Sequence, residues 1–200
     1  MPETGLLPLA DHTLHSLDQA IEGLKNGLVV VCGFPASGKS TVARYLALRL
    51  DAVLFDKDGF APALEQSVMR ELTGNPHDRD SEIYRSVVGP NIYEALTCNA
   101  LRVAQRARVV VDAPFLEFVS AATARMSSLS EFILAKAEAV VPVRSVWVAA
   151  DPETIKNRMI SRGAERDRPK LDDWATYRST VLESGVAAEA EAVVDYFISN

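Results

Sequence analysis

Residues 33–40 carry side chains of the types, and at the spacing, that bind phosphate groups. The segment reads Gly-Phe-Pro-Ala-Ser-Gly-Lys-Ser, a complete match to the pattern G-x-x-x-x-G-K-[ST]. Glycine lets the backbone curl so that its N–H groups converge on phosphate oxygens. Lys39 would then reach the β- and γ-phosphates, and the Ser40 hydroxyl can ligate Mg²⁺. The predicted phosphate-binding residues are Gly33, Pro35, Ala36, Ser37, Gly38, Lys39, Ser40 and Thr41.

The segments on either side of this loop favour the same interpretation. A short apolar run over 28–32 is typical of a buried strand, and residues 41–50 have the composition of a helix. Strand, loop and helix is the order that supports a phosphate-binding loop. A helix that begins near Gly38 would add the positive end of its dipole. A glycine turn with an incidental lysine would not explain this context.

Two carboxylates follow the second apolar run, which covers residues 52–55. Asp56 and Asp58 would face the phosphate-binding loop, because ligands bind at the carboxyl ends of parallel strands. A carboxylate at that place can orient an acceptor hydroxyl and accept its proton. We choose Asp58 as the base and keep Asp56 as the alternative. In the competing interpretation this is only a polar turn in which Asp56 caps the next helix.

A third carboxylate and two aromatic residues complete the candidates near the strand ends. The run Val109-Val110-Val111 ends in Asp112, whose carboxylate can reach Mg²⁺ directly or through water. The alternative for Asp112 is a helix cap. We assign Phe60 and Phe115 to the wall of an acceptor pocket, although such residues often simply join the core.

An arginine-rich segment follows the fourth apolar run. A predicted helix starts at Asp151-Pro152 and stops at Gly163, and the arginines begin within it. Guanidinium groups suit the charged oxygens of a phosphoryl group in transfer, so we predict a lid over 158–170 that closes on phosphates. The arginines are Arg158, Arg162, Arg166 and Arg168. In the alternative, acidic neighbours neutralise them; these are Glu165, Asp167, Asp172 and Asp173.

Composition limits the classes of partner. The 200-residue chain has a net charge of −6, which argues against a broad surface for nucleic acids or anionic membranes. No run reaches the roughly 18 apolar residues of a membrane span, and the N-terminus shows no signal-peptide pattern. Cys32 and Cys98 are typical of small buried side chains rather than of a disulfide. We therefore expect a cytoplasmic protein with neither a membrane nor a nucleic acid as partner.

Five apolar runs alternate with helical stretches along the chain. They are 28–32, 52–55, 109–111, 143–149 and 193–198. This alternation indicates an α/β fold, in which helices cover both faces of a parallel sheet. An amphipathic helix over 11–26 belongs to an N-terminal extension, 1–27, of a single domain that spans 1–200. Gly89-Pro90 is expected to break the helical stretch between Glu82 and Arg106.

These segments together resemble the P-loop kinase superfamily, in its small-molecule and nucleoside-kinase-like branch. Relatives include gluconate kinase, chloramphenicol phosphotransferase, the kinase domain of polynucleotide kinase and zeta toxins. The resemblance covers about residues 28–198 and rests on the segments 33–41, 56–60, 109–112 and 158–168. It implies a three-layer P-loop NTPase fold with five parallel strands in the order 2-3-1-4-5.

The same resemblance implies ATP and Mg²⁺ as cofactors. It also implies Asp58 as the base and contacts from Arg158, Arg162 and Arg166 to the triphosphate. Many relatives carry glycine where this chain has Ala36, and we expect alanine to be tolerated there if its φ is negative.

The sequence therefore predicts a kinase, a transferase that moves the γ-phosphoryl group of ATP to a hydroxyl of a small-molecule acceptor. A nucleoside or nucleotide acceptor is the nearest alternative, and a regulator that binds ATP without transfer is a further one. A GTPase is disfavoured. Residues 56–59 do match D-x-x-G, but they follow the first helix too closely, and the chain has no Asn-Lys-x-Asp motif. The sequence indicates neither the acceptor nor the oligomeric state.

Overall fold

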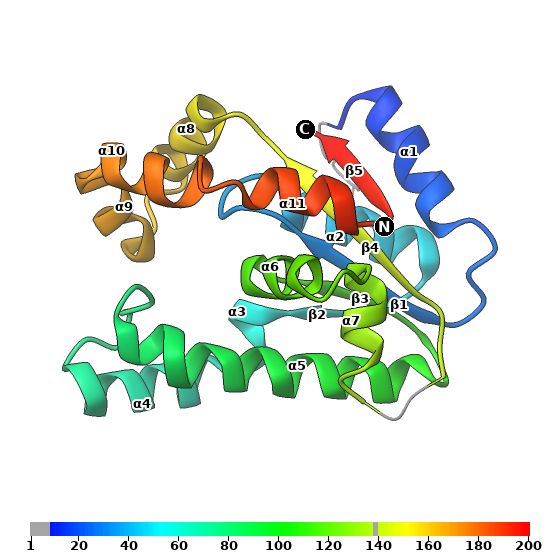
Figure 1. The fold of residues 1–200 in the computed structure, drawn as a ribbon, viewed down its shortest axis with the longest axis horizontal. Coiled ribbons are helices and arrows are strands. Elements are labelled where there is room, and N and C mark those ends of the chain that lie inside the picture. Colours follow the sequence, from blue (N-terminus) through cyan, green and yellow to red (C-terminus); the bar gives the residue numbers. More distant parts are fainter. Residues whose placement is uncertain (1–8, 138–139) are drawn as a thin grey trace, which may run out of the picture.

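One parallel sheet of five strands organises the molecule (Figure 1). The computed structural model describes residues 9–137 and 140–200. The strands are β1 (Gly27–Cys32), β2 (Val53–Asp56), β3 (Arg108–Asp112), β4 (Val143–Ala149) and β5 (Tyr196–Ser199). Their order is β2-β3-β1-β4-β5, and every neighbouring pair runs parallel. The predicted fold class and strand order are confirmed.

Helices connect the strands and cover both faces of the sheet (Figure 1). The first half of the chain contributes α1 (Asp11–Ile21), α2 (Lys39–Leu50), α3 (Lys57–Phe60), α4 (Pro62–Thr73), the π-helical turn η1 (Tyr84–Val88) and α5 (Gly89–Ala104). The second half contributes α6 (Leu116–Ala124), α7 (Leu129–Leu134), α8 (Pro152–Arg162), η2 (Glu165–Asp167), α9 (Arg168–Asp172), α10 (Trp174–Tyr177), η3 (Arg178–Leu182) and α11 (Val186–Val193).

β1 lies at the centre of the sheet because all of its side chains can be buried. Successive strand residues point to opposite faces. Leu28, Val30 and Cys32 enter a core that they share with α5, α6, α7 and α11. Val29 and Val31 enter a second core with α1 and α2. A strand surrounded in this way leaves polar chemistry only at its ends.

The predicted N-terminal helix packs along the sheet edge formed by β5. α1 ends at Ile21, before the predicted end at Asn26, because the chain must turn there to enter β1. Thr13 is buried and donates a hydrogen bond to the Ser199 carbonyl at 3.3 Å. Residues 1–8 of the predicted extension lie outside the described residues. In the described ranges, no helix combines the length and the apolar character needed to span a membrane.

Two further features differ from the sequence-based expectation. The last strand begins at Tyr196, because Val193 ends α11 and is buried there. Gly89 and Pro90 do not break the helical stretch either: η1 leads directly into α5, and Gly89 has helical φ and ψ of −55° and −56°. Pro90 lies in the first turn of α5, where a missing N–H is tolerated. The interruption is therefore one π-helical turn and not a loop.

The backbone of the phosphate-binding loop has three residues with positive φ. Gly33 has φ 139°, and a Cβ there would lie 2.5 Å from the Val148 carbonyl oxygen. Gly38 has φ 105°, and a Cβ there would overlap the Asn200 side chain. Ala36 has φ 63°. We expected alanine to be tolerated here if its φ were negative, and the structure shows a positive φ instead. An alanine in the left-handed region carries about 1–2 kcal/mol of strain.

We predict that Ala36→Gly raises the free energy of unfolding by about 0.5–1 kcal/mol, because glycine relieves this strain but gains freedom in the unfolded chain. Urea unfolding followed by circular dichroism measures the change. Ala188→Gly is the matched control: this exposed residue of α11 has helical backbone, so glycine should lower stability there by about 0.5–1 kcal/mol. Equal losses in both variants would show that Ala36 is not strained.

Candidate phosphoryl-transfer site

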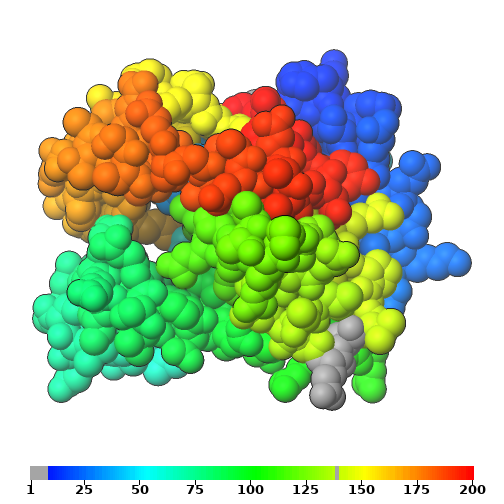
Figure 2. All heavy atoms as spheres, in the orientation of Figure 1, coloured from blue at the N-terminus to red at the C-terminus, as the bar shows by residue number. Residues whose placement is uncertain are grey.

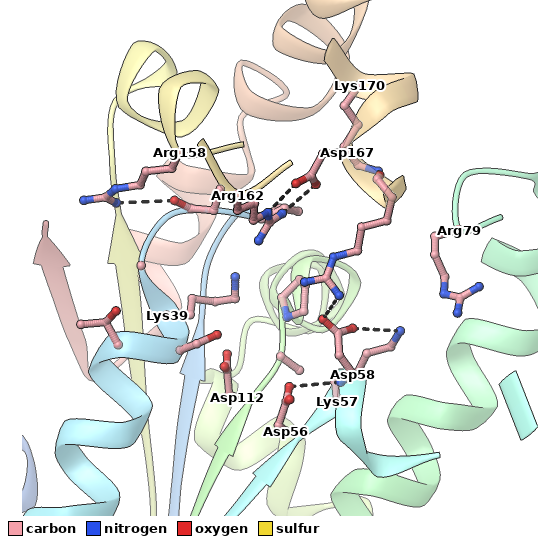
Figure 3. A pocket seen from close by; sticks show the side chains of 18 of the residues that line it. Lys39, Asp56, Lys57, Asp58, Arg79, Asp112, Arg158, Arg162, Asp167 and Lys170 are labelled. Atoms are coloured by element: carbon pink, nitrogen blue, oxygen red, sulfur yellow. Dashed lines mark hydrogen bonds and ion pairs between the residues drawn. The ribbon is translucent and has the colours of Figure 1, made fainter. Parts of the chain in front are cut away.

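A cleft of about 430 Å³ lies at the carboxyl ends of β1, β2 and β3. Lys39, Asp56, Asp58 and Asp112 form its floor, and residues of α8 and of the segment after it form its roof (Figure 3). Figure 2 shows the hollow between this roof and the segment around residues 75–85. The predicted residues that line the cleft are Pro35, Ala36, Gly38, Lys39, Ser40, Thr41, Asp56, Asp58, Asp112, Arg158, Arg162 and Arg166.

Lys39 and Asp112 are two buried charges at the base of the cleft. Lys39 is 7% exposed and donates a hydrogen bond to the Phe34 carbonyl at 2.8 Å. Burial lowers the pKa of Lys39, and the Asp112 carboxylate is the strongest opposing influence. Burial likewise raises the pKa of Asp112, and Lys39 opposes that rise. Each charge therefore offsets part of the other's desolvation.

Asp56 and Asp58 differ in what their side chains do. The β2–β3 register places Asp56 opposite Asp112, and its side chain caps α3 by accepting a hydrogen bond from the Asp58 backbone N–H at 3.1 Å. Asp58 forms an ion pair with Arg166, and its carboxylate lies 3.7 Å from the Lys57 ammonium. The Asp58 side chain is 48% exposed. An acceptor in the cleft can therefore reach Asp58, as a base requires.

Ser40 and Asp112 are the two oxygen-bearing side chains that the sequence predicts as ligands of Mg²⁺. Both line the cleft, and the Ser40 hydroxyl is close enough to oppose the rise in the pKa of Asp112 through a hydrogen bond. One carboxylate and one hydroxyl beside a phosphate site form a partial set, which Mg²⁺ usually completes with phosphate oxygens and water. Within 9–137 and 140–200, no group of three or more His, Cys, Asp or Glu is placed to hold a metal.

Arg158 and Asn200 hold the outer side of the loop. The Arg158 guanidinium donates to the Ser37 carbonyl at 2.8 Å, and the Asn200 amide donates to the same oxygen at 3.1 Å. The Asn200 backbone N–H in turn donates to the Ala149 carbonyl at 2.9 Å. Sequence analysis missed Asn200 because no local pattern marks it. Only the pairing of β5 with β4 brings it to the loop.

Two of the lid arginines are paired with acidic residues inside the lid. Arg162 makes a two-pronged pair with Asp167, with Nη2 and Oδ1 2.7 Å apart, and Asp167 is buried. Arg168 pairs with Glu165 on the surface at 3.1 Å and does not line the cleft. Neighbouring carboxylates therefore neutralise both Arg162 and Arg168, as the alternative interpretation of this segment states. Arg162 nevertheless lines the cleft, where a phosphate can compete for it.

The lid reaches the opposite wall through two ion pairs. The pair at Asp58 is drawn in Figure 3. One joins Arg166 to Asp58, and the other joins Lys170 to Asp80 at 3.1 Å. The last turn of α8 belongs to the molecule's main core instead, through the buried Met159. The segment that spans the cleft is thus 163–172.

A polar network that sequence analysis missed forms the far wall of the cleft. The Glu65 carboxylate accepts hydrogen bonds from Lys57 at 2.7 Å and from the Tyr84 hydroxyl at 2.6 Å, and Arg79 lies 3.0 Å away. Lys57 also donates to the Tyr84 hydroxyl at 2.8 Å. Lys57, Glu65 and Tyr84 are buried. These residues share no motif, and only the fold of α3, α4 and η1 brings them together.

Four residues predicted for the site do not line the cleft. Gly33 and Ser37 are buried in the loop, and the Ser37 hydroxyl has no partner in the described residues. Phe60 packs against Phe55, with ring centroids 6.4 Å apart. Phe115 is buried behind the cleft and borders a separate cavity.

Comparisons with known proteins bear on the family and the fold of the chain. A family model described as an AAA domain matches residues 28–183. Shikimate kinase from Aquifex aeolicus VF5 has a TM-score of 0.53 at 15% identity, and 86% of each chain is covered. Shikimate kinase from Bacteroides thetaiotaomicron has a TM-score of 0.50, also at 15% identity and 86% coverage of each chain. A chain of the PezAT toxin–antitoxin system of Streptococcus pneumoniae has a TM-score of 0.52 at 14% identity, covering 94% of this chain and 74% of that one.

No match is found among curated proteins. The solved structures, at such identities, show a shared fold. The family model covers more than half of the chain, and its span includes the phosphate-binding loop, the aspartates after β2 and β3, and the lid arginines. The chain therefore belongs to the AAA domain family, and the shikimate kinases among the solved structures share its fold.

Proposed function

We propose that this protein is an ATP-dependent kinase that transfers the γ-phosphoryl group to a hydroxyl group of a small molecule. The observation that carries the proposal is the single cleft that Lys39 and Asp58 share, with Arg162 and Arg166 above them. Burial lowers the pKa of Lys39, and the charge of Asp58 is near enough to oppose part of that lowering. A protein that only senses ATP has no need of a carboxylate at the acceptor side. The kinases among the structural neighbours support the same reaction class.

The residues act mainly by positioning and by stabilising charge. Backbone N–H groups of the loop would bind the phosphates, and Lys39 would turn from the Phe34 carbonyl to a phosphate oxygen. Arg162 and Arg166 would exchange their carboxylate partners for oxygens of the transferring group. Asp58, released from Arg166, would orient the acceptor hydroxyl and take its proton as the new P–O bond forms, while the bond from the γ-phosphorus to the β–γ bridging oxygen breaks and ADP leaves.

Ser40 and Asp112 would hold Mg²⁺, which neutralises charge on the β- and γ-phosphates when bound.

Both cysteines are free thiols, which is typical of a reducing compartment, so the proposal includes the cytoplasm. Burial raises the pKa of Cys32 to about 12, so this thiol takes no part in the chemistry.

We predict that Lys39→Ala lowers phosphoryl transfer at least ~10²-fold, because a preorganised charge on the transferring group is lost. The assay is coupled ADP release over a panel of sugars, nucleosides, nucleotides and simple alcohols, which also identifies the acceptor. Lys25→Ala is the control, since Lys25 is exposed and lies outside the cleft. Near-normal turnover by a folded Lys39→Ala protein would overturn the kinase proposal.

Asp58→Asn should abolish transfer to the acceptor and leave the affinity for ATP similar, because its assigned role is at the acceptor hydroxyl. Asp56→Asn is the matched variant, and it should remain active because asparagine also caps a helix. Single-turnover transfer and ATP titration measure the two effects. If only Asp56→Asn is inactive, Asp56 is the base; if both remain active, neither carboxylate is.

The lid should open and close around the nucleotide. The Arg166–Asp58 pair is about half exposed, and such pairs contribute only about 0–1 kcal/mol. We predict rapid hydrogen exchange at amides 163–172 without ligand and much slower exchange with a non-hydrolysable ATP analogue and Mg²⁺. Amides of α8 around the buried Ile155 and Met159 are the internal control and should change little. Equal protection of 163–172 in both states would make its arginines ordinary surface charges.

A further inference from the structure

A second cavity, of about 140 Å³, adjoins the acceptor side of the cleft. Tyr84, Tyr93 and Pro114 line both spaces. The rest of its wall is mostly apolar and includes Pro90, Phe115, Leu116 and Phe118. The proposed phosphoryl transfer gives this cavity no role.

The aromatic wall of the cavity is held rigidly. Phe115 is buried, yet its φ is 53°, a left-handed conformation that is rare for a bulky side chain. Its ring contacts Tyr93 and Phe118, with centroids 5.3 and 5.1 Å apart. Strain of this kind persists where surrounding structure imposes it, and it gathers at binding sites. The cavity is therefore preformed.

The wall between the two spaces is fixed as well. Tyr84 begins the π-helical turn η1, and such turns are frequent at functional sites. Glu65 and Lys57 hold its hydroxyl, and the cations of Lys57 and Arg79 lie 5.5 and 5.2 Å from its ring centre. The buried network on the far wall thus fixes the position of one aromatic ring.

The neighbouring space holds the proposed base. Asp58 lines the cleft, and its charge contributes, after burial, to raising the pKa of Tyr93. A molecule that enters past Tyr93 would therefore have one part in the aromatic cavity and another near Asp58. Among the residues that the structure describes, the charged ones at the cavity are Arg85 and Glu117, and both are exposed.

We propose that this cavity binds an apolar six-membered ring of the phosphoryl acceptor, whose hydroxyl then lies at Asp58. This inference rests on the proposed kinase function for the identity of the ring-bearing molecule. The size fits, because apolar cavities of about 150 Å³ hold a molecule of benzene. The acceptor class is thus a ring-bearing alcohol, rather than a small polyol that has no apolar part.

Binding of the ring is tested without turnover. The probe is 4-fluorobenzyl alcohol, titrated and followed by fluorine NMR with the protein, a non-hydrolysable ATP analogue and Mg²⁺. Leu116→Trp fills the cavity and should weaken binding at least about tenfold, the size of effect that shape changes in apolar pockets produce. Leu116→Phe makes a smaller change at the same position if the tryptophan variant does not fold. Leu64→Trp, on an exposed position of α4, is the control and should bind like the parent protein.

Absence of probe binding, or binding that both Leu116 variants leave unchanged, would overturn the ring site.

The acceptor assignment is tested by ADP release with benzyl alcohol and with ethanol. We expect kcat/KM to be at least about tenfold higher for benzyl alcohol, with the advantage lost in Leu116→Trp. Equal values for the two alcohols would overturn the assignment. Failure of the kinase proposal is a separate result, seen as unchanged turnover in Lys39→Ala while the ring probe still binds.

Discussion

The surrounding structure has to stabilise the buried charge of the Lys39 ammonium. A lysine that is 7% exposed cannot keep its charge without partners, and the chain supplies the Phe34 carbonyl and the Asp112 carboxylate. Asp112 is available only because β3 lies beside β1, with Val31 opposite Asp112. Removing one member of such a buried pair leaves the other uncompensated, so the strand order and the binding chemistry depend on each other.

The position of Lys39 also constrains the backbone of the phosphate-binding loop. The chain must leave β1 and enter α2 within a few residues, and it does so through positive φ at Gly33, Ala36 and Gly38. Two side chains hold this strained loop in place, because Arg158 and Asn200 both donate a hydrogen bond to the Ser37 carbonyl. Strain at Ala36 is thus offset by contacts from α8 and from the end of β5.

Patterns within one stretch of chain predicted the parallel sheet and the phosphate-binding loop, because apolar strands and a fixed eight-residue motif are local signals. The strand order came from the resemblance to P-loop kinases. The helix that stops at Gly163 was equally readable, since proline at its start and glycine at its end are local too. The features that the sequence did not predict depend on contacts between residues that are far apart in the chain. Nothing near Glu65 indicates that Lys57 and Tyr84 will share its carboxylate, and nothing near Asn200 points to Ser37. The φ of Ala36 likewise follows from how the loop is closed.

The ion pair between Arg166 and Asp58 connects the two halves of the proposed reaction. While the pair is formed, the carboxylate that should receive the acceptor proton is occupied by a cation of the lid. A triphosphate would offer Arg166 several charged oxygens in place of one exposed carboxylate, so the proposed nucleotide binding would draw the arginine away. Asp58 then keeps Lys57 as its neighbour at 3.7 Å, and Glu65 holds Lys57 in place at 2.7 Å. Closure of the lid on a triphosphate would therefore remove Arg166 from Asp58, while the network that orders the aromatic wall would keep Lys57 beside that carboxylate.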